Sequence, residues 1–266
     1  MSLCVIIDSG LGNQLFMIFT GISKAIDEKR DFSIYPIYNN NIRTYYFTSL
    51  FKSIIYKVAY NVNSNQIYTE PSFSYQPIPD NLNFIRGYFQ SPKYFHHNRN
   101  NIIELLGIDE FKQKYNFGFS AIAIHLRFGD FSFNQGNHVL LKIDYYIKAL
   151  TTLLKKINKD EYRFIIFGEK NDNELIDDYL NILNNLFDIK FEKIYDLYND
   201  LTDWKELIYM SSCEHFIIAN STFSWFGAYL SNNSIKNVLY SNQWFGENIK
   251  DKNVKDLFLD DWIEIS

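Results

Sequence analysis

The chain has 266 residues, of which 47% are hydrophobic and 21% charged, a balance typical of a soluble globular protein with one large domain or two modest ones. Its net charge of −5 argues against the basic surface of a protein that binds nucleic acid or an anionic membrane. No apolar run approaches the ~20 residues of a membrane span, and the first ten residues lack the basic start of a signal peptide, so we expect a cytoplasmic protein.

The chain opens with a strand, a glycine turn and a helix. The run from Leu3 to Ile7 is continuously apolar, which is typical of a buried parallel strand. Gly10 and Gly12 follow, so the backbone can approach a ligand closely and the start of the helix offers N–H groups to an anion. As a dinucleotide-binding fingerprint the turn is incomplete, because its third glycine position falls at Leu15 and no acidic residue follows a second strand.

The rest of the first half has mixed signals. We expect a short strand at 32–38, a possible helix at 48–60, a strand from Phe84 into Gly87, a helix at 98–106 and a linker at 114–119. The strand from Phe84 into Gly87 ends close to three polar side chains that could contact a ligand, Arg86, Tyr88 and Gln90. Packing is the alternative role for such an aromatic-rich strand end.

Past the linker, apolar strands alternate regularly with helical segments. The predicted strands are 121–126, 163–168, 190–195, 215–219 and 237–241, and the predicted helices are 143–157, 172–185 and 203–212. This alternation indicates a parallel, doubly wound sheet with helices on both faces. We therefore expect two domains, 1–115 and 116–266. Cys4 and Cys213 lie in apolar segments and are expected to be buried free thiols rather than a disulfide.

The segment 120–131 changes from an apolar strand to a polar site within a few residues. His125, Arg127 and Asp130 arrive together at the carboxyl end of the strand, with Gly129 supplying a turn. Open α/β sheets bind their ligands at this edge. The planar fork of Arg127 suits a diphosphate or a carboxylate, and the alternative is a structural salt bridge to Asp130.

A second polar strand end follows at 220–222. Ser221 and Thr222 come between the apolar strand at 215–219 and a further helix, which is where a hydroxyl side chain caps a helix. The same hydroxyls and N–H groups would form an anion cradle if a phosphate were bound. Both roles remain open at this point.

Four blocks of the chain together resemble the α-1,2-fucosyltransferases that use GDP-fucose, glycosyltransferase family 11. The blocks are GLGNQLF, GYFQSPKYF, HLRFGDF and ELIYMSSCEHFIIANSTFSWFGAYL, in the family's order and spacing over essentially the full length. The resemblance implies an α/β fold of GT-B type, two Rossmann-like lobes with a cleft between them, the first on the acceptor side and the second binding the donor. It also implies an inverting, metal-independent transfer of L-fucose from GDP-fucose to the 2-hydroxyl of a galactose-terminated glycan.

The resemblance also implies roles for individual residues. Arg127 would contact the β-phosphate, His125 would lie near the nucleoside, and Glu206, or less favourably Asp203, would bind the guanine edge. The other donor residues implied are Gly10, Gly12, Gln14, Ser221, Thr222 and Phe223. Tyr88, Gln90 and Ser91 would bind the acceptor, and Asn13 would act in catalysis by positioning either sugar.

The expected chemistry agrees with these roles. Cleavage of a sugar–diphosphate bond leaves negative charge on the phosphate, which Arg127 would stabilise without a metal or another cofactor, and the chain has no Asp-x-Asp pair to hold one. Asp130 is the expected general base, with orientation of Arg127 as its alternative role.

Two departures from the family pattern leave alternatives open. Phe128 replaces a second Arg, and the segment 168–170 reads Gly-Glu-Lys where Ser-Asp-Asp is common. An inactive module that binds a sugar nucleotide or a glycan on the same scaffold is therefore the alternative function. A nicotinamide oxidoreductase is disfavoured by the missing acidic partner of the glycine turn.

Overall fold

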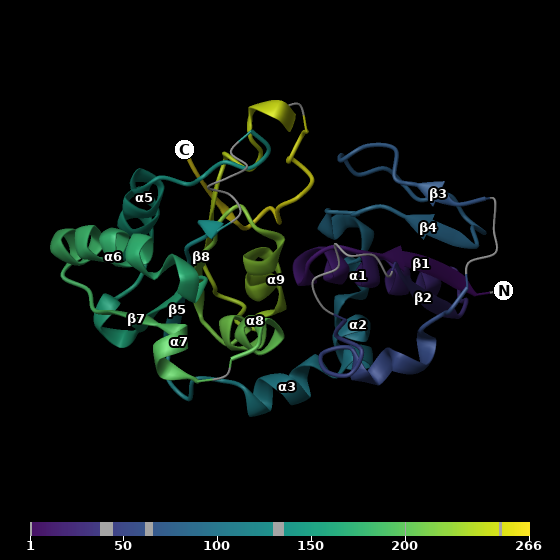
Figure 1. Ribbon diagram of the computed structural model, residues 1–266, viewed down its shortest axis with the longest axis horizontal. Helices are drawn as coiled ribbons and strands as arrows, with labels where there is room; N and C mark the ends of the chain where they lie inside the picture. The colour runs from purple at the N-terminus through teal and green to yellow at the C-terminus, as the bar shows by residue number, and fades with distance from the viewer. Residues whose placement is uncertain (1, 38–44, 62–65, 130–135, 200, 250–251) are drawn as a thin grey trace. The chain divides into compact units, whose positions relative to one another are not determined.

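The computed structural model describes the chain except for residues 1, 38–44, 62–65, 130–135, 200 and 250–251 (Figure 1). The chain divides into two compact units. Unit 1 comprises Met1–Phe111 with Lys252–Leu259, and unit 2 comprises Lys112–Asp251 with Asp260–Ser266. A short segment near the carboxyl end of the chain therefore belongs to the first unit.

Unit 1 is built on a parallel sheet with the strand order β2-β1-β4-β3. The strands are β1 (Leu3–Ile7), β2 (Phe32–Pro36), β3 (Tyr68–Thr69) and β4 (Phe84–Arg86). The helices are α1 (Leu11–Asp27), α2 (Arg99–Leu106) and α3 (Ile108–Lys114), and the 3₁₀ turns are η1 (Lys52–Lys57), η2 (Pro92–Tyr94) and η3 (His96–Asn98). The chain first passes from unit 1 to unit 2 within α3.

Helix α1 lies directly on strand β1. Every residue of β1 is buried, as its continuous apolar run predicts. A Cβ added to Gly21 of α1 would lie 2.7 Å from Cγ1 of Val5, so glycine allows the helix to approach the strand this closely. The predicted strand–turn–helix is therefore confirmed.

Unit 2 is built on a longer parallel sheet with the strand order β10-β9-β8-β5-β6-β7. The strands are β5 (Ala121–His125), β6 (Arg163–Phe167), β7 (Phe191–Lys193), β8 (His215–Ile217), β9 (Val238–Ser241) and β10 (Ile263–Ile265). The helices are α5 (Ile143–Leu154), α6 (Asn173–Phe187), α7 (Ile194–Leu197), α8 (Asp203–Ser211) and α9 (Thr222–Leu230), with the 3₁₀ turns η4 (Lys159–Glu161), η5 (Lys170–Asp172) and η6 (Glu247–Ile249).

Helices cover both faces of this second sheet, with α5 and α6 on one side and α8 and α9 on the other (Figure 1). Ile122 and Ile124 of β5 belong to the apolar cluster under α5 and α6. Because side chains alternate along a strand, His125 belongs to the opposite face, where its ring contacts Phe223 of α9. The alternation thus places one polar residue of an apolar strand at the α9 side of the sheet.

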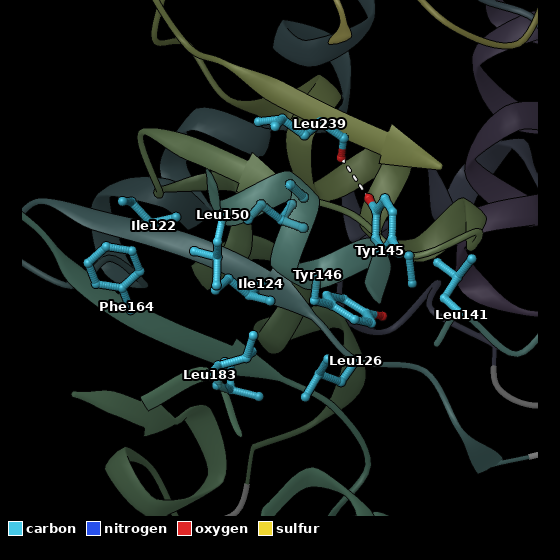
Figure 2. Close-up of a cluster of buried hydrophobic side chains, with 14 of the residues drawn as sticks. Ile122, Ile124, Leu126, Leu141, Tyr145, Tyr146, Leu150, Phe164, Leu183 and Leu239 are labelled. Atoms are coloured by element: carbon cyan, nitrogen blue, oxygen red, sulfur yellow. Dashed lines mark hydrogen bonds between the residues drawn. The ribbon is translucent and has the colours of Figure 1, made fainter. Parts of the chain in front are cut away.

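Tyrosine hydroxyls join α5 to the sheet within the apolar cluster. The hydroxyl of Tyr145 donates to the carbonyl of Ile218 at 2.6 Å and to that of Leu239 at 3.2 Å, the second of which is drawn in Figure 2. Tyr146 donates to the carbonyl of His125 at 3.0 Å. These bonds satisfy the buried phenols and fix α5 over the strand ends.

The predicted α/β fold, with a parallel sheet in each half, is confirmed, and so is the doubly wound pattern of the second half (Figure 1). Cys4 and Cys213 are buried free thiols, as expected. Two predicted elements differ in extent. The possible helix at 48–60 is a short 3₁₀ turn, η1, and the predicted strand 190–195 ends at Lys193, where α7 begins.

Candidate functional site

The sheet of unit 2 changes its winding direction between β5 and β8. β6 follows β5 on one side in the sheet, whereas β8 lies on the other side. In such sheets the two chain segments that leave the neighbouring strands diverge and leave a crevice for a ligand. His125 and Arg127 follow one of these strands, and Ser221, Thr222 and Phe223 follow the other.

His125 is a neutral side chain in this position. It is 5% exposed, and its ring lies 5.8 Å from the ring of Phe223, tilted by 43°. Burial, and then the charge of Arg127, lower the pKa of His125 to about 3. Its Nδ1 is buried and accepts or donates no hydrogen bond among the residues that the structure describes. His125 can therefore offer an uncharged ring and one polar nitrogen to a ligand, but no proton at neutral pH.

Arg127 is held by an ion pair with Glu169. Its Nη1 donates to Oε1 of Glu169 at 2.8 Å, and its side chain is 16% exposed, against 50% for Glu169. Asp130, the predicted alternative partner of Arg127 and the predicted base, lies outside the described residues. The pairing of His125 with Phe167 between β5 and β6 brings Glu169 beside Arg127.

A second carboxylate from the same connection holds the turn after β5. The amide of Gly129 donates to Oδ2 of Asp172 at 2.8 Å, and Gly129 has a φ of 25°. This conformation favours glycine, as the sequence suggested. Phe128, in contrast, is buried in the apolar cluster with its ring 5.0 Å from that of Tyr179. Phe128, which the sequence resemblance sets at the position of a second Arg, therefore contributes to the core and not to the polar edge.

Glu206 lies in the first turn of α8 and is partly buried. Burial, followed by the negative charges of Asp203 and Glu169, raises its pKa to about 8. Asp203 is exposed, and its Oδ1 accepts the amide of Trp204 at 2.8 Å. Of the two acids predicted to bind the guanine edge, Glu206 is the one in a low-dielectric position close to Glu169.

The start of α9 is capped by Ser221. Its Oγ accepts the amide of Phe223 at 3.3 Å, so the capping role considered from the sequence is present. Asn220, which was not among the predicted site residues, is buried at the preceding position. Its Nδ2 donates to the carbonyls of Val139 at 2.9 Å and Trp244 at 3.2 Å, which ties this turn to two other loops. The sequence signal for Asn220 is an amide side chain directly after an apolar strand.

Unit 1 has its own change of winding direction, between β1 and β4, and predicted site residues lie there. Nε2 of Gln90 donates to Oδ1 of Asn13 at 2.8 Å, and the hydroxyls of Ser9 and Tyr88 are 3.3 Å apart. Tyr88 is 42% exposed. Asn13 and Gln90 are therefore brought together within this unit, and Tyr88, beside Ser9, presents an aromatic surface to solvent.

The remaining predicted residues of unit 1 have hydrogen bonds within the fold. The side chain of Gln14 donates from Nε2 to the carbonyl of Ser9 at 2.8 Å. Its backbone N–H donates to the carbonyl of Gly10, the N-cap residue of α1. Gly12 is buried in the first turn of α1. Ser91 is fully buried, and its hydroxyl donates to the carbonyl of Asp256 at 2.6 Å. The hydroxyl of Ser91 is thus bonded inside unit 1.

Among the described residues, no group of three or more His, Cys, Asp and Glu side chains is placed to hold a metal ion. Over the same part of the chain, no helix has the length and apolar character that crossing a membrane requires. Metal-independent chemistry stays a prediction.

Comparison with known proteins gives the family. The model of glycosyl transferase family 11 matches residues 56–266, and the chain belongs to this family. The family predicted from the four sequence blocks is therefore confirmed.

Two Escherichia coli proteins are similar in sequence. The O-antigen biosynthesis glycosyltransferase WbnK is 28% identical over 194 residues, which cover 67% of this chain and 59% of WbnK. An α-1,2-colitosyltransferase is 29% identical over 130 residues, which cover 47% of this chain and 41% of that protein. The chain thus spans about half the length of these curated relatives.

Solved structures that the chain matches include the fucosyltransferase NodZ from Bradyrhizobium, with a TM-score of 0.47, 10% identity and coverage of 86% of this chain and 94% of NodZ. They also include the E. coli ADP-heptose heptosyltransferase II, with a TM-score of 0.48, 10% identity and coverage of 100% and 90% of the two chains.

Proposed function

We propose that this protein transfers L-fucose from GDP-fucose to the 2-hydroxyl of a galactose-terminated glycan, with inversion at the sugar. Membership of glycosyltransferase family 11 supports a sugar-nucleotide donor, and the names of the two E. coli relatives support a bacterial glycan and an α-1,2 linkage. The observation that carries the proposal is the partly buried Arg127 at the carboxyl end of β5, where the sheet changes its winding direction.

In this proposal Arg127 binds the diphosphate of the donor. When the bond between the sugar and the β-phosphate oxygen breaks, its electron pair stays on that oxygen, and the permanent charge of Arg127 stabilises it. Arg127 is already restrained by Glu169 in the free protein, so little reorganisation is needed. No divalent metal is required for this charge stabilisation.

The nucleoside lies beside His125, Phe223 and Glu206 in this proposal. The two rings offer apolar contact for the base and ribose, and neutral His125 adds no charge that would repel Arg127. The carboxylate of Glu206 accepts from the N–H groups on one edge of guanine, which distinguishes guanine from adenine. The start of α9, with Ser221 and Thr222, lies near the pyrophosphate.

The acceptor binds to unit 1 in this proposal. Tyr88 stacks on a sugar ring, and the amides of Asn13 and Gln90 hydrogen-bond its hydroxyls. The 2-hydroxyl oxygen attacks the anomeric carbon of fucose as that carbon leaves the phosphate, and Asp130 takes the hydroxyl proton. Colitose, which the name of one relative contains, is the second donor sugar to test.

Replacement of Arg127 tests the proposal. Arg127→Ala should lower the rate of GDP release from GDP-fucose with a β-galactoside acceptor by a factor on the order of 10²–10³, because a donor of the leaving-group site is lost. Its melting temperature should change little, since Glu169 is half-exposed and can be solvated.

Arg163→Ala is the matched control, because Arg163 pairs with Glu192 between β6 and β7, at the amino end of β6. This control should turn over normally. Normal turnover in Arg127→Ala would remove Arg127 from the mechanism. Binding of GDP-fucose by the wild-type protein without turnover on a broad acceptor panel would favour the inactive binding module.

A further inference from the structure

The ion pair between Arg127 and Glu169 is asymmetric in exposure. The guanidinium is mostly enclosed, at 16% exposed, whereas the carboxylate is half in solvent, at 50%. Removal of all anions from an enclosed guanidinium is costly, but return of a half-exposed carboxylate to water costs little. The pair is therefore suited to exchange of one anion for another at Arg127.

The surroundings of Glu169 weaken its hold on this position. Burial, then the charge of Asp203, and then that of Glu169 raise the pKa of Glu206, so Glu169 and Glu206 lie close enough to repel each other when both are ionised. Among the described residues, Arg127 is the cation that pairs with Glu169. Position 128 supplies no second guanidinium, because the residue there is a phenylalanine. Its ring is buried against Tyr179.

Glu169 is also not needed to hold the turn that follows β5. That turn is fixed by Asp172, whose Oδ2 accepts the amide of Gly129 at 2.8 Å. The amide of Asp172 in turn donates to the carbonyl of Glu169 at 2.9 Å, so the backbone of the β6–α6 connection is fixed independently of the Glu169 carboxylate. The Glu169 side chain can therefore leave Arg127 while the turn stays in place.

We propose that Glu169 is an internal anion that occupies Arg127 in the ligand-free protein, and that the diphosphate of the bound nucleotide displaces it. Glu169 then limits the affinity of this site for anionic ligands. The inference rests on the proposed function, because Arg127 is the diphosphate-binding residue there. Since both the sugar nucleotide and the free nucleotide carry a diphosphate, return of Glu169 to Arg127 also promotes release of the GDP product.

Isothermal titration with GDP and with inorganic pyrophosphate tests this proposal. Glu169→Gln keeps the size of the side chain and Glu169→Ala removes it, and both should bind each probe about tenfold more tightly than the wild-type protein at low ionic strength. GDP should also dissociate about tenfold more slowly from both variants in stopped-flow displacement. Glu174→Gln, an exposed position in the first turn of α6, makes the same change in net charge and should match the wild-type protein.

The two variants separate competition from positioning. If Glu169 only oriented Arg127, Glu169→Ala would bind both probes more weakly, and that result would overturn the proposal. Equal affinity in all four proteins would overturn it as well. Tighter binding of pyrophosphate by the variants, with no binding of GDP by any protein, would support the exchange at Arg127 and contradict the proposed nucleotide donor. Absence of binding of either probe to all four proteins would contradict both.

Discussion

Ionisation of Glu206 should couple nucleotide binding to pH. In the free protein the pKa of Glu206 is raised to about 8, so the side chain is mostly protonated at pH 7. A carboxylate that accepts the N–H groups of guanine must be ionised. Binding of GDP should therefore release a proton from Glu206, and Glu206→Gln should abolish that release.

The magnitude follows from the shifted pKa. Below pH 8 the ionised fraction falls about tenfold for each pH unit, so the GDP affinity of the wild-type protein should rise up to about tenfold between pH 6 and pH 7 and level off above pH 8. Because Glu206 is only partly buried, solvent screening makes these values upper limits. At pH 7 nearly one proton should be released per GDP.

Titration at pH 7 in buffers with different ionisation enthalpies measures this proton directly. GDP has its own titrating phosphate, which contributes equally to the wild-type protein and to Glu206→Gln, so the difference between them isolates Glu206. The variant should bind GDP more weakly above pH 8 and lack the proton release. The same proton release in both proteins would refute the assignment of Glu206 to the guanine edge.

Three further predictions concern His125, Tyr145 and metal dependence. The pKa of His125 is lowered on folding, so its contribution to stability is present above pH 6.5 and is lost as the pH falls towards 3, by about 1.4 kcal/mol per pH unit. His125→Gln should therefore flatten the dependence of unfolding free energy on pH in acid. An unchanged dependence would contradict a buried neutral ring. Tyr145→Phe should cost about 1–3 kcal/mol in urea unfolding, because the buried carbonyl of Ile218 loses the hydroxyl that donates to it. The exposed Tyr60→Phe should have no effect, and equal stabilities of the two variants would show that the Tyr145 hydroxyl contributes nothing. EDTA should leave the proposed fucosyl transfer intact, and loss of activity that Mg²⁺ or Mn²⁺ restores would contradict charge stabilisation by Arg127 alone.

The second half of the fold could be predicted because its strands are buried on both faces. Strands such as β5 have continuous apolar runs, and helical spacing separates them clearly. The segment around η1 was harder. Its apolar residues suggest a helix, but Ile55 and Tyr56 are exposed and only Ile54 of the turn is buried, so no continuous apolar face holds a longer helix there.

The polar edge of unit 2 was predicted in part. His125 and Arg127 are identifiable because they follow a buried strand directly. The partner of Arg127 was not, because Glu169 lies 42 positions away and meets Arg127 only through the pairing of β5 with β6. The return of 252–259 to unit 1 likewise depends on tertiary contacts such as the hydrogen bond between Ser91 and Asp256, for which the local sequence has no signal.

A crystal structure with GDP bound tests the central claim most directly. The account predicts that the guanidinium of Arg127 contacts the diphosphate and that its ion pair with Glu169 is broken. A structure in which that ion pair is intact, with the diphosphate bound away from Arg127, would contradict it.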